Sequence, residues 1–190
     1  MHDLNADVQR LDILLGESQA LRGSTPPERT DPGRRFLRDL LANAQRRADE
    51  GHYDDAVARL YSAIEKTAKI ALWVRHGINN SRVDVERMPE SIREELRPMA
   101  DADGMARIGL QKSYALLASL GDALGAAYME RRQELERQLE ARNTSLLAHG
   151  FEPIGAEKYQ KLLGIALDFL HATADDLPVF PQLDWKALLP

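Results

Sequence analysis

The stretch from residue 54 to residue 76 constrains the fold more than any other part of the sequence. Its apolar residues recur every three or four positions, at Val57, Leu60, Ile64, Ala68, Ala71 and Leu72. That spacing places them on one face of an α-helix, whereas a half-buried strand would alternate apolar and polar residues. Asp54 or Asp55 can cap the beginning of this helix, and Gly77 can end it.

The amino-acid composition extends the helical prediction to the whole chain. Leucine and alanine total 53 residues, whereas valine and isoleucine total only 14. Because leucine and alanine favour helices and β-branched residues favour strands, we predict an all-α protein. Apolar periodicity predicts further helices at 3–22, 34–50, 108–120, 127–149 and 156–174, with a short helix after Pro89. The expected fold is a helical bundle of about five to six helices.

Proline and glycine divide the chain into segments. Three prolines and two glycines lie within residues 23–33, and such a stretch cannot continue a helix. We therefore predict a linker at 23–33, preceded at 1–22 by an N-terminal helix or interdomain connection. Residues 34–176 then form the helical domain, and the proline-bearing segment 177–190 is expected to dock on it as a C-terminal tail.

The sequence excludes several classes of protein. It has no cysteine, so it has no disulfides and no thiolate metal site. It has no apolar run of about 18 residues and no basic stretch followed by an apolar core at its beginning, so we expect a cytoplasmic protein without a membrane span. His52, His76 and His171 fit packing or capping roles, and we expect neither a metal nor a cofactor.

Residues 142–150 carry the pattern that points most directly to chemistry. Arg142 and His149 are seven positions apart, so on a helix they project from nearly the same face, about 10 Å apart along the axis. Asn143 lies at the edge of that face. The Asn-Thr-Ser run has mediocre helix propensity within a helix of strong helix formers, and such local inconsistency is typical of functional sites.

An arginine and a histidine on one face have a specific chemical use. Arginine binds phosphate through two parallel hydrogen bonds and offsets charge that builds up in a transition state. Histidine, with an ordinary pKa of about 6.5, transfers protons near neutral pH. Together they suit attack of an RNA 2′-hydroxyl on its own 3′-phosphate. The alternative interpretation is a surface Arg142 and a His149 that only caps its helix.

Residues 142–151 resemble the motif of the HEPN superfamily of helical ribonucleases, in which four to six residues separate the arginine from the histidine. They are most similar to the HEPN segment of CRISPR-associated ribonucleases that pair a CARF sensor domain with a C-terminal HEPN domain. Residues 53–61 and 120–125 also resemble that group, and the similarity covers about residues 34–176.

The resemblance implies a dimeric, metal-independent endoribonuclease that cleaves single-stranded RNA in antiviral defence. Arg142 and His149 would be catalytic, and Asn143 would support them, with the two copies of the site in one cleft. An acidic residue on an earlier helix often positions this motif, and Glu65 is the candidate. The alternative for Glu65 is an exposed ion pair with Lys69, four residues further along the helix.

The chain departs from that group in one respect. A CARF domain is an α/β unit, and this sequence has no succession of strands and is too short to hold both domains. A CARF sensor that binds cyclic oligoadenylate is therefore expected in a longer, full-length protein, unless the chain is a stand-alone relative. Residues 130–142 hold four arginines and four glutamates, which predicts weak RNA affinity and a shallow dependence on salt.

Two rival functions remain open from the sequence. The chain can be a non-catalytic helical module for dimerisation or RNA binding that has kept the fold. It can also be a scaffold in which the spacing between Arg142 and His149 arose by chance.

Overall fold

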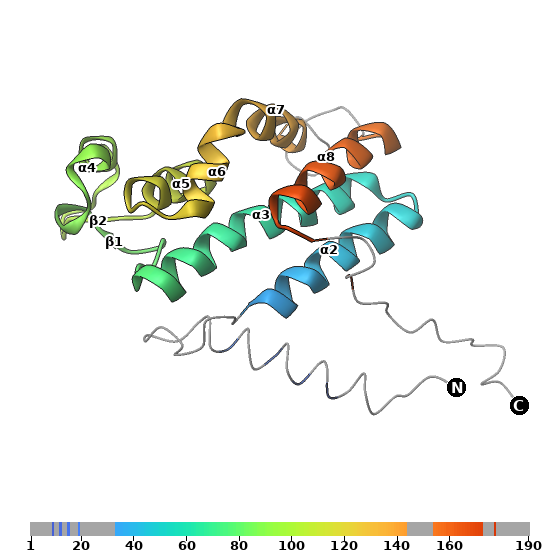
Figure 1. Cartoon of the computed structure of the whole chain (residues 1–190), viewed down its shortest axis with the longest axis horizontal. Helices are drawn as coiled ribbons and strands as arrows, with labels where there is room; N and C mark the ends of the chain where they lie inside the picture. The colour runs from blue at the N-terminus through green and yellow to red at the C-terminus, as the bar shows by residue number, and fades with distance from the viewer. Residues whose placement is uncertain are drawn as a thin grey trace, which may run out of the picture.

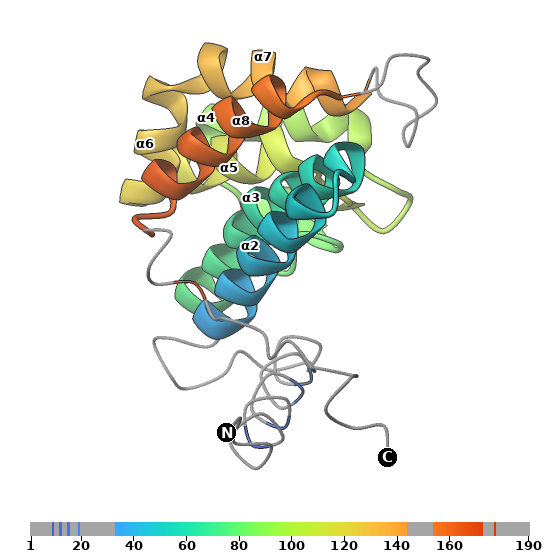
Figure 2. The ribbon, with the colours of Figure 1, turned by 90° about the vertical axis from the view of Figure 1, so that its right-hand side faces the viewer.

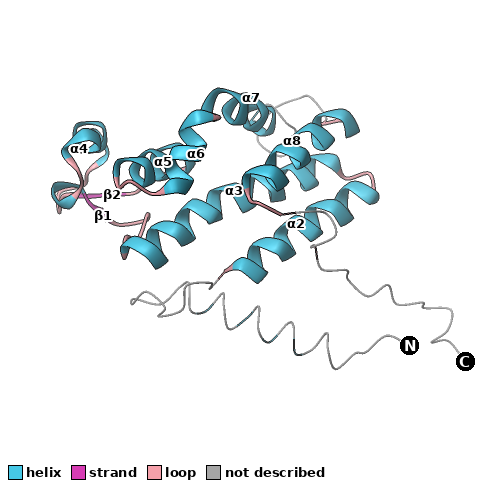
Figure 3. Ribbon diagram, viewed as in Figure 1, coloured by secondary structure: helices cyan, strands magenta, loops and turns pink. Residues whose placement is uncertain are grey.

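The structure, a computed structural model, describes residues 33–143 and 154–172, and the single residues Gln9, Asp12, Leu15, Gln19 and Leu177. In these residues it contains seven α-helices, two 3₁₀-helices and one pair of two-residue strands (Figures 1 and 3). The predicted all-α class is confirmed. None of the helices in the described part of the chain is both long and apolar enough to cross a membrane.

Helices α2 (Arg34–Asp49) and α3 (Tyr53–His76) lie side by side and run in opposite directions (Figures 1 and 2). Gly33 begins α2 with a left-handed φ of 97°, and a Cβ atom at this position would lie 2.7 Å from Ile70 Cδ1. Glycine therefore allows the first turn of α2 to approach α3. The two helices meet through small buried residues: Ala42, Ala44, Ala48, Ala56, Ala63 and Ala68.

The end of α3 agrees with the sequence prediction. Gly77 has a left-handed φ of 67°, and its amide donates to the carbonyl of Trp73 at 3.1 Å. The bond of Gly77 is that of an αL C-cap, and the amide of Ile78 donates in addition to the carbonyl of Leu72 at 3.0 Å. The apolar face predicted for this helix is buried, so α3 is the central helix of the bundle.

A short irregular region follows α3. Strands β1 (Val83–Asp84) and β2 (Met105–Ala106) pair in antiparallel fashion, with Val83 opposite Ala106. Between them lie the 3₁₀-helix η1 (Val85–Arg87), helix α4 (Glu90–Leu96) and the 3₁₀-helix η2 (Arg97–Met99). The short helix predicted after Pro89 is confirmed. The strands were not predicted, because two residues are too few to show an alternating pattern.

Four helices complete the described bundle: α5 (Leu110–Ser119), α6 (Ala123–Glu130), α7 (Arg132–Asn143) and α8 (Ala156–Phe169). The predicted helix at 127–149 was wrong at its beginning, because α6 starts earlier and ends before α7. Asp122 starts α6 by accepting the amide of Leu124 at 2.9 Å. The part of that prediction beyond residue 143 lies outside the described residues.

Gly125 in α6 is a packing residue. A Cβ atom at this position would lie 2.2 Å from the backbone nitrogen of Ala118 in α5. The sequence analysis did not assign this role, since a glycine inside a helix is usually read as a weak point.

The predicted helix at 156–174 is shorter than expected. Helix α8 ends at Phe169, and His171 has a left-handed φ of 49°, a conformation that terminates helices.

An aromatic cluster joins α3, α5, α6 and α8. Tyr114 and Tyr128 stack with ring centroids 4.1 Å apart and an interplanar angle of 3°. Phe169 presents its ring edge-on to both, at 5.6 and 6.2 Å. The hydroxyl of Tyr114 donates to the carbonyl of Ile64 at 2.7 Å. This cluster fixes α8 over the centre of the bundle.

The predicted outer segments are largely outside the described residues. This applies to the linker at 23–33, except Gly33, and to the tail at 177–190, except Leu177. Of the helix predicted at 3–22, four single residues are described and all four are helical. One of them, Leu15, is 58% exposed.

Candidate functional site

The first half of the Arg–His motif is at the end of α7. Leu135 and Leu139 in this helix are buried. Position 142 comes seven residues after Leu135 and three after Leu139, so it belongs to the same stripe of the helix. Arg142 and Asn143 are the last two residues of α7. Their side chains, and the whole of His149, lie outside the described residues, so the shared face stays a prediction.

Ile154, the first described residue after α7, is buried next to the beginning of α3. Its backbone amide donates to both carboxylate oxygens of Asp54 at 3.3 Å. Close by, the rings of Tyr53 and Tyr159 lie 6.0 Å apart and connect α3 to α8. The segment 144–153 therefore has two described neighbours in the chain. Before it comes α7, a helix that contacts α3 and α8, and after it comes Ile154, whose amide is bound at the first turn of α3.

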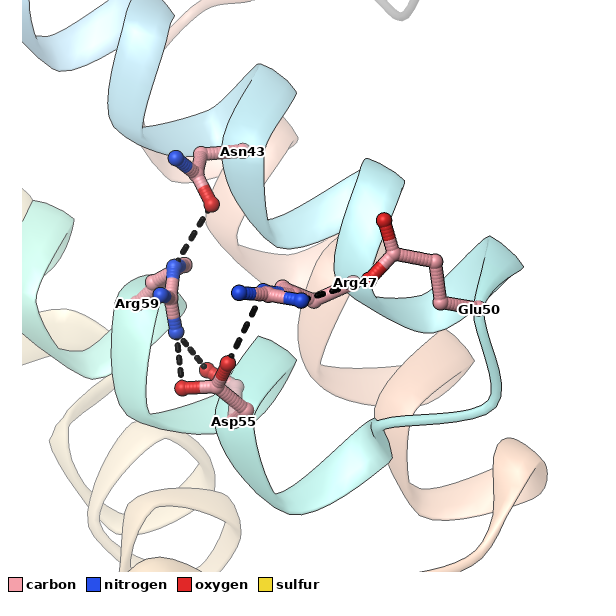
Figure 4. A network of polar contacts seen from close by, with 5 residues as sticks. All are labelled: Asn43, Arg47, Glu50, Asp55 and Arg59. Carbon is pink, nitrogen blue, oxygen red and sulfur yellow. Dashed lines mark hydrogen bonds and ion pairs between the residues drawn. The ribbon is translucent and has the colours of Figure 1, made fainter.

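A network of charged groups fixes that first turn to α2 (Figure 4). The carboxylate of Asp55 contacts two guanidinium groups, those of Arg59 in the same helix and Arg47 in α2, the latter at 3.0 Å. Arg59 also donates to the side chain of Asn43 at 2.6 Å, and Arg47 pairs with Glu50 at 2.6 Å. Both arginines are therefore neutralised within the protein and serve as support for the turn that contacts Ile154.

A second network lies at the opposite end of α3. The carboxylate of Asp122 accepts from Arg75 at 3.0 Å, from His76 at 3.0 Å and from the amide of Leu124 at 2.9 Å. Burial raises the pKa of Asp122, but the hydrogen bonds from His76, Leu124 and Arg75 outweigh it, so the pKa lies below its usual value. Asp122 thus caps α6 and ties it to α3, and His76 has the structural contact expected from the sequence.

A pocket of about 510 Å³ lies beside α7. Its lining residues come from α3, α5, α6 and α7: Tyr61, Gly109, Leu110, Gln111, Lys112, Tyr128, Glu136 and Leu139. Tyr128 is fully buried, and its hydroxyl has no hydrogen-bond partner among the described residues. Burial raises the pKa of this hydroxyl to about 12, so it stays protonated and able to donate. Leu139 precedes Arg142 by one turn, so the pocket adjoins the beginning of the motif.

A neighbouring pocket of about 420 Å³ contains Glu65. Its lining residues are Glu65, Lys66, Lys69, Asn80, Ser81, Arg107, Ile108 and Gly109. No ion pair between Glu65 and Lys69 is present in the described part of the chain, and Glu65 does not line the pocket beside α7. It is eleven residues from Asp54, or roughly 16 Å along α3. The supporting role of Glu65 stays a prediction.

The family model described as the Csm6 HEPN domain matches residues 27–173. The chain belongs to the Csm6 HEPN family. The matched range contains α2 to α8 and includes both Arg142 and His149. The resemblance found in the sequence is thereby confirmed, and the family is one of CRISPR-associated proteins of ribonuclease type. Comparisons with curated proteins and with solved structures gave no significant match.

Within this HEPN domain, the remaining histidines are dispersed. His52 precedes α3 and is exposed, and His171 follows α8 and is also exposed. In the part of the chain that the structure describes, no three side chains of metal-ligating type come together. Trp73 is buried and belongs to the core.

Sequence reasoning missed the contacts of Asp54 and Asp55 in the first turn of α3. Asp54 was considered only as a helix cap, and its contact with Ile154 joins positions 100 residues apart. The pairing of Asp55 with Arg59 could have been predicted from the sequence, because carboxylate and guanidinium groups four residues apart on a helix commonly pair. The additional contacts to Arg47 and Asn43 depend on the packing of α2.

Proposed function

We propose that this chain is a metal-independent endoribonuclease that cleaves single-stranded RNA, with Arg142 and His149 as its catalytic residues. The match to the Csm6 HEPN family over a range that includes both residues carries the proposal. The position of Arg142 at the end of α7, beside an open pocket, supports it.

The proposed reaction is an internal transesterification. The His149 imidazole accepts the proton of a ribose 2′-hydroxyl, and the 2′-oxygen forms a new bond to the adjacent phosphorus. Arg142 binds the non-bridging oxygens and offsets the additional negative charge. The bond from phosphorus to the 5′-oxygen then breaks, and that oxygen takes up a proton. The products are a 2′,3′-cyclic phosphate and a 5′-hydroxyl. Asn143 supports the phosphate contact.

Two copies of the domain are proposed to act together. One imidazole accepts the first proton, and the second imidazole of a homodimer is in a position to supply the proton for the leaving oxygen when both motifs share one cleft. In the full-length protein, we propose a CARF sensor domain that responds to cyclic oligoadenylate and a role in CRISPR-linked antiviral defence.

A cleavage assay tests the assignment. The protein is incubated with an end-labelled single-stranded RNA in the presence of a metal chelator. We expect Arg142→Ala and His149→Ala each to lower the rate at least 100-fold, because each removes a group that acts in the transition state. Arg137→Ala is the matched control for an arginine of α7, and His52→Ala is the control for an exposed histidine. Both should cleave as the wild type does.

The contrary outcomes separate the alternatives. If Arg142→Ala and His149→Ala both cleave RNA at the wild-type rate, the assignment of these two residues as catalytic is wrong. RNA binding without any cleavage by the wild type would indicate the non-catalytic module instead. Sedimentation equilibrium that finds only monomers at assay concentration would refute the shared cleft.

A further inference from the structure

Three cationic side chains around the pocket that contains Glu65 have no partner among the described residues. These are Lys66 and Lys69 of α3 and Arg107, which follows β2. None of them forms a hydrogen bond or ion pair within the described residues. We call these three residues the α3–α5 basic patch. Lys69 and Arg107 are exposed, and Lys66 is partly exposed.

Several other cations among the described residues are paired with carboxylates. The guanidinium groups of Arg59, Arg75 and Arg131 each contact a carboxylate. The patch brings three cations together with one carboxylate, Glu65, in a protein of net charge −5. Like charges held close together repel one another, so a bound anion would stabilise this arrangement.

Asn80 lines the same pocket and is 8% exposed, and its side-chain nitrogen lies 3.4 Å from the carbonyl of Ile108. Its side-chain oxygen is buried and has no hydrogen-bond partner among the described residues. That oxygen is an acceptor, so it suits a hydroxyl group of a ligand and not its phosphate.

The basic patch is continuous with the pocket beside α7. Gly109 lines both pockets. It also precedes α5, a helix of ten residues whose beginning has no side-chain cap. Backbone amides at such a helix start favour phosphate. Tyr128 lines the pocket beside α7, and its fully buried hydroxyl, which has no partner among the described residues, offers a further donor.

We propose that the α3–α5 basic patch binds backbone phosphates of the RNA strand. The strand would extend from this patch past the beginning of α5 to the end of α7. The proposal rests on the proposed function, because it takes single-stranded RNA as the ligand. Two pockets that share Gly109 as a lining residue fit a chain of phosphates better than one small anion. Lys66 and Lys69 are one turn apart, roughly 4.5 Å along α3, and can contact neighbouring parts of a strand.

Two variants in which charges are neutralised test this inference, and each also carries His149→Ala so that binding is measured without cleavage. The patch variant adds Lys66→Gln, Lys69→Gln and Arg107→Gln. The matched control adds Arg87→Gln, Arg97→Gln and Lys161→Gln, which remove the same charge from exposed residues outside the patch. Glutamine retains good helix propensity, and circular dichroism checks that both fold.

We expect the patch variant to bind a fluorescent single-stranded RNA about 10- to 100-fold more weakly at about 100 mM salt. Its log–log salt slope should be shallower by about 2, because each phosphate contact to a single strand contributes about 0.7. The control should bind within about twofold of the parent. Equal affinity and equal salt slope for the two variants would overturn the inference.

This outcome is separable from that of the proposed function. Cleavage by the wild type together with an unaffected patch variant would refute the patch and leave the nuclease assignment intact. Patch-dependent RNA binding without any cleavage would retain the patch and refute the nuclease. Failure of the parent to bind RNA, with patch-dependent capture of an acidic peptide, would replace RNA by a protein ligand and overturn the inference.

Discussion

Asp54 and Ile154, one hundred positions apart in the chain, are joined by a hydrogen bond from the amide of Ile154 to both carboxylate oxygens of Asp54, at 3.3 Å. The carboxylate lies in the first turn of α3, where the helix dipole also favours negative charge. This contact fixes the point at which the chain enters α8 after the segment that contains His149.

We expect Asp54→Ala to lower RNA cleavage about 10-fold while reducing the unfolding free energy by only about 1 kcal/mol. The catalytic effect follows because a small displacement of a reacting group costs more than the lost hydrogen bond. Glu50→Ala is the control, since Glu50 is exposed and pairs with Arg47 near the same end of α3. If the two variants cleave equally fast, Asp54 has no positioning role.

A pair of glycine substitutions tests the close approach of α5 and α6. Gly125→Ala places a Cβ atom 2.2 Å from the backbone nitrogen of Ala118, so one helix must shift. We expect the unfolding free energy to fall by about 1–3 kcal/mol. In Gly164→Ala, in α8, the added Cβ atom has no other atom within 4 Å. This substitution should raise the unfolding free energy by about 0.5–1 kcal/mol. Urea denaturation measures both, and a stabilising Gly125→Ala would contradict the packing.

The hydroxyl groups of the two stacked tyrosines differ in their hydrogen bonding. Tyr114→Phe removes a hydrogen bond to the Ile64 carbonyl and should lower the unfolding free energy by about 1 kcal/mol. Tyr128→Phe removes a buried hydroxyl that has no partner in the described residues, so stability should stay equal or rise. If Tyr128→Phe also weakens RNA binding, the hydroxyl donates to the ligand. A loss of stability in Tyr128→Phe alone would contradict this assignment.

Asp122 makes the stability of the bundle depend on pH. Its pKa is lower in the folded protein than in the unfolded chain, although burial alone raises it, because hydrogen bonds from His76, Leu124 and Arg75 favour the carboxylate. The resulting stabilisation is present above about pH 4 and is lost as the pH falls through the folded pKa.

Asp122→Asn keeps a side chain that caps helices well and removes the charge. We expect it to lower the unfolding free energy at pH 7 by about 1–3 kcal/mol, and to lose less stability than the wild type between about pH 5 and 3. Asp168→Asn, in an exposed pair with Arg131, should change stability by less than about 1 kcal/mol. If the unfolding free energies of Asp122→Asn and of the wild type fall equally as the pH is lowered, Asp122 is not the cause of the pH dependence.

The sequence was sufficient where a local pattern determines the structure. The apolar stripe of residues 54–76 and the glycine after it determine α3 and its end, because both act within a few residues. The boundary between α6 and α7 was missed, since Arg131 at the break pairs with Glu134 and with Asp168, and the second of these contacts depends on the packing of α8. The packing role of Gly125 could not be predicted, because it depends on the backbone of another helix.

Part of the candidate site could also be predicted from the sequence, and part of it depends on tertiary packing. The spacing of Arg142 and His149 is a property of the sequence, and the family match includes both residues. The contact between Asp54 and Ile154 and the meeting of two pockets at Gly109 arise only from tertiary packing. No local pattern predicts which exposed lysines lack a partner, so Lys66 and Lys69 could not be distinguished from other surface cations by sequence alone.

If the proposed chemistry takes place near Asp54 and the α3–α5 basic patch binds the same strand, the unbroken length of α3 sets a minimum size for an efficient substrate. From Asp54 to Lys66 the helix rises roughly 18 Å, and the spacing cannot shorten without unfolding a turn. An oligonucleotide that reaches only one end of that span would then gain the chemistry or the electrostatic attraction, but not both. Dinucleotides should therefore be turned over far more slowly than longer strands with the same scissile bond.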